Sequence, residues 1–431
     1  MATLITKHIG SAYPTGRDYA TIQDFIAAIP SDLVAADEAW LGLLYNDSEF
    51  TITAELTCTK TTSAACYVEM RPASGEGFAE HASHLTNPLK YDQSKGVGIH
   101  FNLDWTPGFS FNGTNHLTIS GVQARSTTSY IERVFDVKGA NSRLARSLIE
   151  MKSDHTVISV DGGGLVENNI VIYTSGAPTT AAIDLGWDSA TANNNTFYVS
   201  AGGATKAIKG YSATSAKNNL LIGYNSNAII CASASNTATT AAADLGSGNV
   251  YSITAADVVE NATYATLDLR TKSGSVTIGA GATGTGVTLD ILGQTRASPP
   301  GIGAHEYVAG GTATATTLSG PSSGTTGVAS SNFTVGANDT IVGTVTVTPN
   351  DGGDGGTFAP TSVAISSGTP TATFTYTPAS TGVKVISTTN DGGLSNPTSI
   401  NYTSNAAASA YDPILSQRMQ LSGINYYGVR R

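Results

Sequence analysis

Three short segments decide the fold of this chain: Asn168-Asn-Ile-Val-Ile-Tyr173, Asn194-Asn-Thr-Phe-Tyr-Val199 and Asn218-Asn-Leu-Leu-Ile222. In each of them, asparagines precede a run of β-branched or other apolar residues, and the segments follow one another after 26 and 24 residues. A similar segment, Asn115-His-Leu-Thr-Ile119, begins two steps of about 26 residues earlier. A period in this range, with no helical pattern between the strands, is typical of a solenoid built from β-strands.

The repeat therefore predicts a β-solenoid over residues 111–309, because one coil alone cannot bury its apolar side and must share a core with its neighbours. We expect asparagines aligned at one corner to form hydrogen bonds from coil to coil. An antiparallel β-sandwich with coincidental asparagine spacing is the alternative that the pattern leaves open.

The first 110 residues lack this repeat and contain one helical pattern, from Asp18 to Pro30. Thr21 and Asp24 have the spacing of a capping box, and Pro30 ends the pattern. The apolar face of this helix consists of Ile22, Phe25, Ile26 and Ile29. We interpret residues 1–110 as an N-terminal cap with irregular β structure, and Ile22 and Phe25 as candidate docking residues.

Residues 310–404 show an apolar alternation with period two, which is typical of half-buried strands. About seven short strands are separated by turns such as Asn350-Asp-Gly-Gly353 and Asn390-Asp-Gly-Gly393, and this pattern predicts an immunoglobulin-like β-sandwich. The alternating residues are Ile341, Val345 and Val347, then Ala372, Phe374 and Tyr376, then Val383 and Val385.

Residues 405–431 combine aromatic and basic side chains in a chain that is otherwise acidic. We predict that they form a C-terminal docking tail, and a terminal strand or helix packed on its own sandwich is the alternative. The candidate docking residues of this tail are Tyr411, Arg418, Tyr426, Tyr427, Arg430 and Arg431.

Two segments carry a resemblance to known proteins. Asp290, Gly293 and Arg296, followed by Gly301-Ile-Gly-Ala-His-Glu306, resemble the closing coil of right-handed parallel β-helix proteins of the pectate-lyase-like superfamily. Gly301 stands where that family usually has Asp, and His305 where it usually has Tyr. The resemblance implies that these residues close the end of the solenoid, so that His305 and Glu306 receive no catalytic role.

The second segment, Arg17-Asp-Tyr-Ala-Thr-Ile-Gln-Asp-Phe25 with Tyr45-Asn-Asp-Ser-Glu-Phe50, resembles the opening of β-helix proteins encoded by tailed bacteriophages. The C-terminal region is similar to the disulfide-free Ig-like modules of phage virion proteins and bacterial surface proteins. Together they imply an all-β chain, with a right-handed parallel β-helix (solenoid) followed by an immunoglobulin-like β-sandwich. The function implied is that of a structural virion protein that assembles as a homotrimer. Within the virion, we expect a capsid decoration or head-spike protein that docks on the phage capsid or other virion proteins.

Composition argues against several other partners. The formal net charge is −10, only 13% of the residues are charged, and no cluster of Lys and Arg is interleaved with aromatic residues, so we expect no nucleic-acid binding. No apolar run reaches the roughly 18 residues of a membrane span, and the first residues do not resemble a signal peptide. We expect synthesis in the host cytoplasm, location in the virion, and no cofactor or metal.

Catalysis is not expected, because the acidic residues of the solenoid are scattered singly and suit solvated turns. The main alternative function is a tailspike that binds or cleaves host surface polysaccharide. A cleaving enzyme requires two carboxylates in adjacent coils about 5–10 Å apart, whereas a glycan-binding protein without activity requires exposed Tyr or Trp. The ionisable residues considered for catalysis are Asp161, Glu167, Asp184, Asp188, Lys206 and Lys209.

Overall fold

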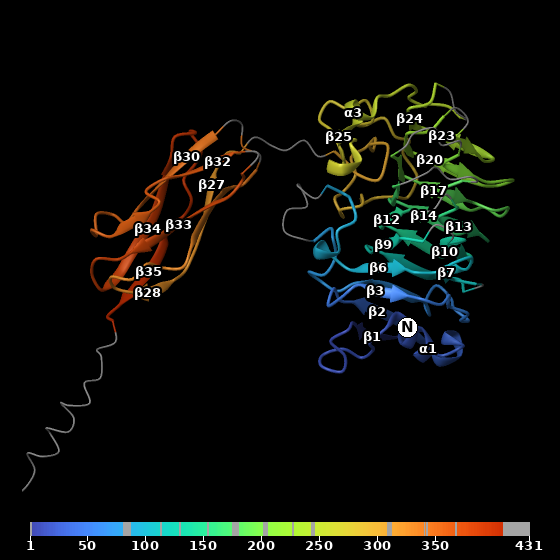
Figure 1. Ribbon diagram of the computed structural model, residues 1–431, viewed down its shortest axis with the longest axis horizontal. Coiled ribbons are helices and arrows are strands. Elements are labelled where there is room, and N and C mark those ends of the chain that lie inside the picture. Colours follow the sequence, from blue (N-terminus) through green and yellow to red (C-terminus); the bar gives the residue numbers. More distant parts are fainter. Residues whose placement is uncertain are drawn as a thin grey trace, which may run out of the picture. The chain divides into compact units, whose positions relative to one another are not determined.

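The computed structural model divides the chain into two compact units, residues 1–307 and 308–431, which are described separately (Figure 1). The described residues are 2–80, 88–112, 114–128, 131–152, 155–174, 181–200, 206–225, 228–242, 246–307, 313–339, 341, 344–366 and 369–407.

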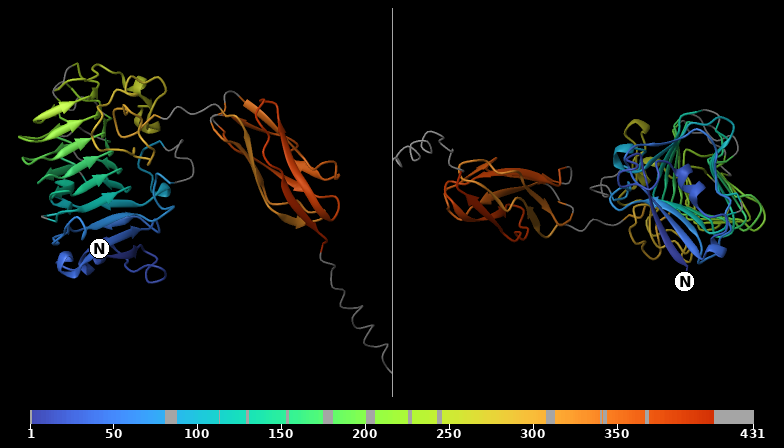
Figure 2. Two further views of the ribbon diagram at one scale, coloured as in Figure 1. Left: turned by 180° about the vertical axis from the view of Figure 1, so that it is seen from behind. Right: turned by 90° about the horizontal axis from the view of Figure 1, so that it is seen from below.

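The first unit is a parallel β-helix in which three parallel sheets surround one apolar core (Figure 2, right). The chain passes from sheet A to sheet C to sheet B and back to sheet A in every complete coil. Sheet A contains β1 (Thr3–Ile9), β2 (Glu38–Leu44), β5 (Val68–Pro72), β8 (Leu117–Ser120), β11 (Arg143–Ala145), β14 (Leu165–Glu167), β17 (Thr191–Asn193), β20 (Ser215–Lys217) and β23 (Ser233–Ser235). Sheet B contains β4 (Leu56–Thr57), β7 (Pro107–Ser110), β10 (Arg133–Lys138), β13 (Ile158–Asp161), β16 (Ile183–Asp184), β19 (Ile208–Lys209) and β22 (Ile229–Ile230). Sheet C contains β3 (Phe50–Ile52), β6 (Gly98–Phe101), β9 (Gln123–Ser126), β12 (Leu148–Met151), β15 (Ile170–Tyr173), β18 (Thr196–Val199), β21 (Leu220–Ile222) and β24 (Ala238–Thr239).

The strands β1 to β7, within residues 3–110, already belong to the three sheets of the solenoid, so the described part of the N-terminal region is not the irregular cap expected from the sequence. Its coils carry long insertions, residues 10–37 after β1 and 73–97 after β5, which hide the period that is visible later in the chain. The first insertion contains α1 (Ile22–Ala28) and α2 (Leu33–Ala36). The expected N-cap is present at α1, where the Thr21 side chain accepts a hydrogen bond of 3.1 Å from the Asp24 backbone N–H.

The corner between sheets A and C explains the asparagine repeat. One residue per coil adopts a left-handed conformation there, and Asn tolerates this conformation better than most residues. The next residue points inward: the backbone N–H of Asn169 donates to Asn195 Oδ1 (3.0 Å), and that of Asn195 to Asn219 Oδ1 (3.0 Å). This inner ladder confirms the predicted coil-to-coil hydrogen bonding. The left-handed residues are Arg146, Asn168, Asn194, Asn218 and Asn236.

The earlier segment at Asn115 does not belong to this ladder. It precedes β8 in sheet A, whereas Asn168, Asn194 and Asn218 precede strands of sheet C. In the coil that contains β11 and β12, Arg146 and Ser147 occupy the two corner positions. The sequence spacing therefore aligned Asn115 with the wrong corner.

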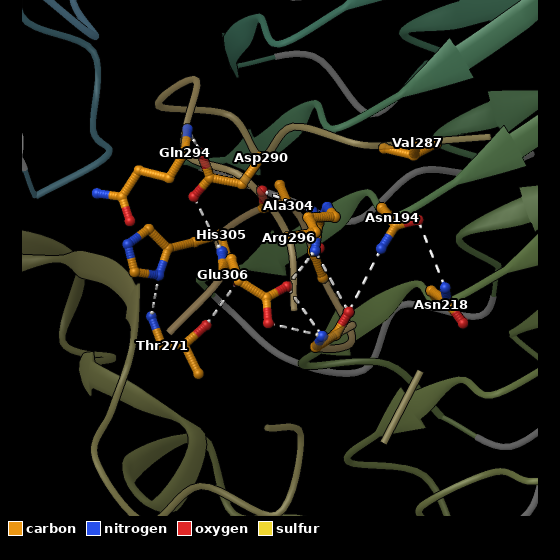
Figure 3. Close-up of polar contacts among 12 residues, drawn as sticks. Asn194, Asn218, Thr271, Val287, Asp290, Gln294, Arg296, Ala304, His305 and Glu306 are labelled. Atoms are coloured by element: carbon orange, nitrogen blue, oxygen red, sulfur yellow. Dashed lines mark hydrogen bonds and ion pairs between the residues drawn. The ribbon is translucent and has the colours of Figure 1, made fainter. Parts of the chain in front are cut away.

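The segment expected to close the end of the solenoid instead runs along its side. Residues 277–306, called the strap below, lie across the A–C corner, where the outward-facing asparagines donate to strap carbonyls. Figure 3 shows this contact for Asn194. Asn168 donates to Leu289 O (2.6 Å), Asn194 to Gly301 O (3.3 Å), Asn218 to Ala282 O (2.9 Å) and Asn236 to Ala280 O (2.9 Å).

The strap and the residues before it cover the outer face of sheet C over its later strands. This covering explains why β15, β18 and β21 are apolar on both faces, without the alternation of a half-exposed strand. A second apolar cluster forms there, and Ile172 and Tyr198 of the sheet pack with Leu269 and Ile302 of the covering segment. The covering segment also contains α3 (Ala255–Val258), β25 (Val259–Asn261) and β26 (Asp268–Thr271).

The second unit is the β-sandwich predicted from the sequence, with nine strands described in place of about seven. Phe333, Phe374 and Tyr402 pack in its core. Val383 and Val385 lie on the exposed face instead of the core, because Lys384 and Ile386 of the same strand point inward. One sheet contains β27 (Thr316–Ser319), β29 (Phe333–Ala337), β33 (Ala372–Thr377) and β31 (Thr357–Ala359). The other contains β28 (Ser323–Thr325), β35 (Ile400–Asn405), β34 (Gly382–Asn390), β30 (Thr344–Asn350) and β32 (Val363–Ser366).

Candidate functional site

The candidate docking residues of the N-terminal helix are not available to a partner. Ile22 and Phe25 are 1% and 0% exposed, and Phe25 packs against Trp40 at 6.0 Å between ring centroids. The helix therefore covers the core of its own solenoid, and the docking expectation for these two side chains is wrong. The strand β35 extends to Asn405, and the tail residues Tyr411, Arg418, Tyr426, Tyr427, Arg430 and Arg431 lie outside the described residues.

Two of the carboxylates considered for catalysis, Asp161 and Asp184, lie in adjacent coils next to the same residue, Gly186, whereas Glu167 lies in sheet A. Glu167 forms an ion pair with Arg143, and Asp184 lies 3.7 Å from Lys209 in the next coil. Asp161 accepts a hydrogen bond from the Gly162 backbone N–H at 2.9 Å, and Asp188 is exposed. Partners in the same turn or in the neighbouring coil are therefore present for Glu167, Asp184 and Asp161. Lys206 is partly exposed and forms no described ion pair.

An exposed aromatic pair lies on the turn that follows sheet B. The rings of Trp187 and Tyr211 stack in adjacent coils, 4.0 Å apart and within 4° of parallel, although the two residues are 61% and 36% exposed. Lys209 Nζ lies 5.0 Å from the centre of the Tyr211 ring. In the coil on the other side, the Gly163 backbone N–H donates to Asp188 O at 2.8 Å, next to Trp187 in the chain. A flat, uncovered aromatic surface next to charged groups is suited to stacking against a sugar ring.

A second cluster, which sequence reasoning missed, lies on the outer face of sheet C over its earlier strands. Tyr264 of the covering segment contacts it through a hydrogen bond of 3.2 Å from its hydroxyl to Glu150. His100, Arg125 and Glu150 are neighbours in register across β6, β9 and β12. Glu49 accepts two hydrogen bonds of 2.6 Å from Arg125 and a third, shorter one from the Tyr91 hydroxyl. No sequence motif indicates this cluster, because its members come from three strands, the residue before β3 and an inserted loop.

The two carboxyls of this cluster differ in their pKa values. Burial acts to raise the pKa of Glu49, but the hydrogen bonds from Arg125 and Tyr91 outweigh it and the pKa is lowered. Burial raises the pKa of Glu150, against the opposing effects of Tyr264, Lys90 and Arg125. Glu150 Oε2 is buried without a hydrogen-bond partner among the described residues. The arrangement holds one ionised carboxylate and one that retains its proton to higher pH, on either side of a guanidinium.

We expect Glu150→Gln to stabilise the protein at pH 8 and to leave it nearly unchanged at pH 4. A folded-state pKa above 4.5 means that the folded chain binds this proton more tightly than the unfolded chain, so stability falls as pH rises through the raised pKa. The expected increase in Tm at pH 8 is about 2 °C, measured by calorimetry. Glu49→Gln should show the opposite sign, a lower Tm at pH 8, because that carboxylate is ionised and paired. An equal effect of Glu150→Gln at both pH values would contradict the assignment.

A third cluster of ionisable residues lies within the strap, and its contacts hold the strap in place (Figure 3). Arg296 and Glu306 form an ion pair of 2.9 Å with both side chains 2% exposed. Arg296 also donates to Asn168 Oδ1 (2.5 Å) and to three strap carbonyls. Asp290 accepts the backbone N–H groups of Leu292, Gln294 and Glu306. His305 Nδ1 accepts from the Thr271 backbone N–H at 3.0 Å. Apart from Arg296 Nε, which is buried without a hydrogen-bond partner among the described residues, these groups are paired within the chain and hold the strap on the corner.

Among the described residues, no group of three or more His, Cys, Asp or Glu side chains is placed to hold a metal ion. Within the same residues, no helix is long and apolar enough to cross a membrane. Neither a protein-family model nor a curated protein matches this chain.

Proposed function

We propose that this chain is a structural virion protein of a tailed bacteriophage, a capsid decoration or head-spike protein that docks on the particle and projects from it. The observation that carries the proposal is that two sets of hydrogen bonds hold the solenoid together. One set is the inner asparagine ladder, and the other joins the corner asparagines to the strap. Both devices favour a rigid body, because they join successive coils through buried hydrogen bonds. The added β-sandwich and the resemblance of the opening segment to phage β-helix proteins support the same proposal.

Cryo-electron microscopy of phage particles, with and without the gene for this chain, tests the proposal. We expect a density for the β-helix on the capsid surface that disappears when the gene is deleted. Density at the tail tip would replace the decoration role with the tailspike alternative, and absence of the chain from purified particles would refute a virion role.

Light scattering of the purified protein tests the proposed homotrimer, for which the mass should be three times the 44.0 kDa of one chain.

The exposed pair Trp187–Tyr211 favours one second candidate, the binding of a host surface glycan without cleavage. Aromatic side chains in binding sites present a large apolar face at low entropic cost. If this candidate holds, Trp187→Ala should weaken binding on an array of bacterial surface polysaccharides by about tenfold or more, the loss typical of a central aromatic contact. The matched control is Trp105→Ala, since Trp105 is 65% exposed but lies outside this pair. Equal loss in both variants, or no binding by the wild type, would exclude the pair as a glycan site.

A further inference from the structure

A small open cavity of about 110 Å³ lies where β5 and β8 of sheet A reach the A–C corner. Arg71, Arg146 and one carboxylate, Glu80, line it together with Ser120, Gly121 and Ile291, the last of which belongs to the strap. Two guanidinium groups at one small concavity are the donor set that proteins use for oxyanions, because each presents several N–H groups in a plane.

Arg146 departs from the pattern of its own corner. Four later coils place Asn at the equivalent left-handed position, and the preceding coil places Gly121 there, yet Arg146 adopts the same conformation at φ 48°. A longer side chain in this conformation costs backbone strain that Asn or Gly would largely avoid. Strain of this kind is often retained where the side chain has a role of its own.

The guanidinium of Arg146 has no hydrogen-bond or ion-pair partner among the described residues, although the residue is partly buried. Each acidic group nearby has another partner: Glu69 pairs with Arg71 at 3.1 Å, and Glu167 pairs with Arg143. Glu80, which also lines the cavity, accepts the Gly75 backbone N–H through its Oε2 atom at 2.6 Å. Asp290 accepts three backbone N–H groups of the strap. Burial and the nearby Arg143 guanidinium lower the pKa of Arg146, and the carboxylates of Glu69 and Asp290 offset this effect only in part.

We propose that this cavity binds an oxyanion, with Arg146 as the principal ligand and Arg71 as the second. The ligand is a phosphate or carboxylate group, either free in solution or carried by an acidic polysaccharide. The volume of about 110 Å³ accommodates such a group and not a whole oligosaccharide, so any attached sugar would extend outward through the open side of the cavity. The site lies apart from the Trp187–Tyr211 pair and does not depend on the proposed virion role.

Isothermal titration calorimetry of the full chain tests this site with two probes, sodium phosphate and a glucuronate oligosaccharide, at constant ionic strength set by chloride. We expect saturable binding of at least one probe, weakened about tenfold or more in Arg146→Asn, since a charge-assisted hydrogen bond contributes that much. Preference for phosphate would identify a free anion as the ligand, and preference for the glucuronate oligosaccharide would identify an acidic polysaccharide. Arg270→Gln removes an arginine paired with Asp268 elsewhere and should bind like the wild type.

Arg146→Asn is chosen because it restores the residue used by the later coils at this corner, so its Tm should equal or exceed that of the wild type. Arg71→Gln provides a second variant that leaves the corner untouched and should also weaken binding. Failure of the wild type to bind either probe, or unchanged affinity in both variants, would overturn the proposal.

Discussion

Replacing Asn195 by Ala is expected to destabilise the solenoid by about 2–4 kcal/mol, because it interrupts the inner ladder at its centre. The side chain is fully buried, accepts hydrogen bonds from the backbone and side chain of Asn169, and donates to Val166 O at 3.0 Å and Asn219 Oδ1 at 3.1 Å. Alanine leaves the buried N–H of Asn169 without its acceptor, and no water from outside reaches this position. The free energy of unfolding from denaturant titration measures the effect.

Asn193→Ala is the matched control, two positions away in the same coil. The Asn193 side chain is also buried, but its Oδ1 atom has no hydrogen-bond partner among the described residues. Removing this side chain should therefore cost less than about 1 kcal/mol, or stabilise the fold slightly. Equal losses in the two variants would mean that burial and packing, and not the ladder hydrogen bonds, account for the asparagines at this corner.

Glu306→Gln should release the strap, because it removes the counter-charge of the buried Arg296. Loss of one member of a buried ion pair costs about 3–5 kcal/mol, since the remaining charge stays out of water. The expected result is local: hydrogen exchange should become faster in residues 277–306, and a hydrophobic dye should bind the uncovered outer face of sheet C. The coils themselves should remain protected, because their core cluster does not include the strap.

Asp268→Asn provides the comparison for this variant, because it breaks the more exposed pair that Asp268 forms with Arg270 at 2.5 Å. A solvent-accessible pair contributes about 0–1 kcal/mol, so exchange in the strap should be unchanged. If Glu306→Gln left strap protection intact, the strap would be held by its apolar contacts and the asparagine hydrogen bonds alone.

Local sequence pattern predicted the elements whose signals lie close together in the chain. The paired asparagines before Ile170, Thr196 and Leu220 predicted stacked coils and a corner ladder, because a left-handed turn and an inward amide impose the same residue types in each coil. The period-two alternation predicted the sandwich, because alternate residues of a half-buried strand face the core. The pattern failed in residues 1–110, where insertions of variable length separate the strands and remove the period.

The candidate sites were less predictable, because their members are distant in sequence. Arg125, Glu49 and Glu150 become neighbours only when coils stack, and Trp187 meets Tyr211 only in the register between two turns. Nothing in the order of residues distinguishes Arg146 from other surface arginines until its left-handed conformation and its lack of a partner are known.

The sequence by itself thus determined the architecture, a parallel β-helix with asparagines at one corner followed by a β-sandwich. Short-range residue patterns reflect backbone conformation and burial, and both features depend on these two properties. Only the tertiary structure decided that the segment Asp290–Glu306 lies along the side of the solenoid and fastens to Asn168 and Asn194. The same buried charges and turns would suit an end cap as well. Their position depends on which apolar surface remains uncovered, and that surface exists only after the coils have stacked.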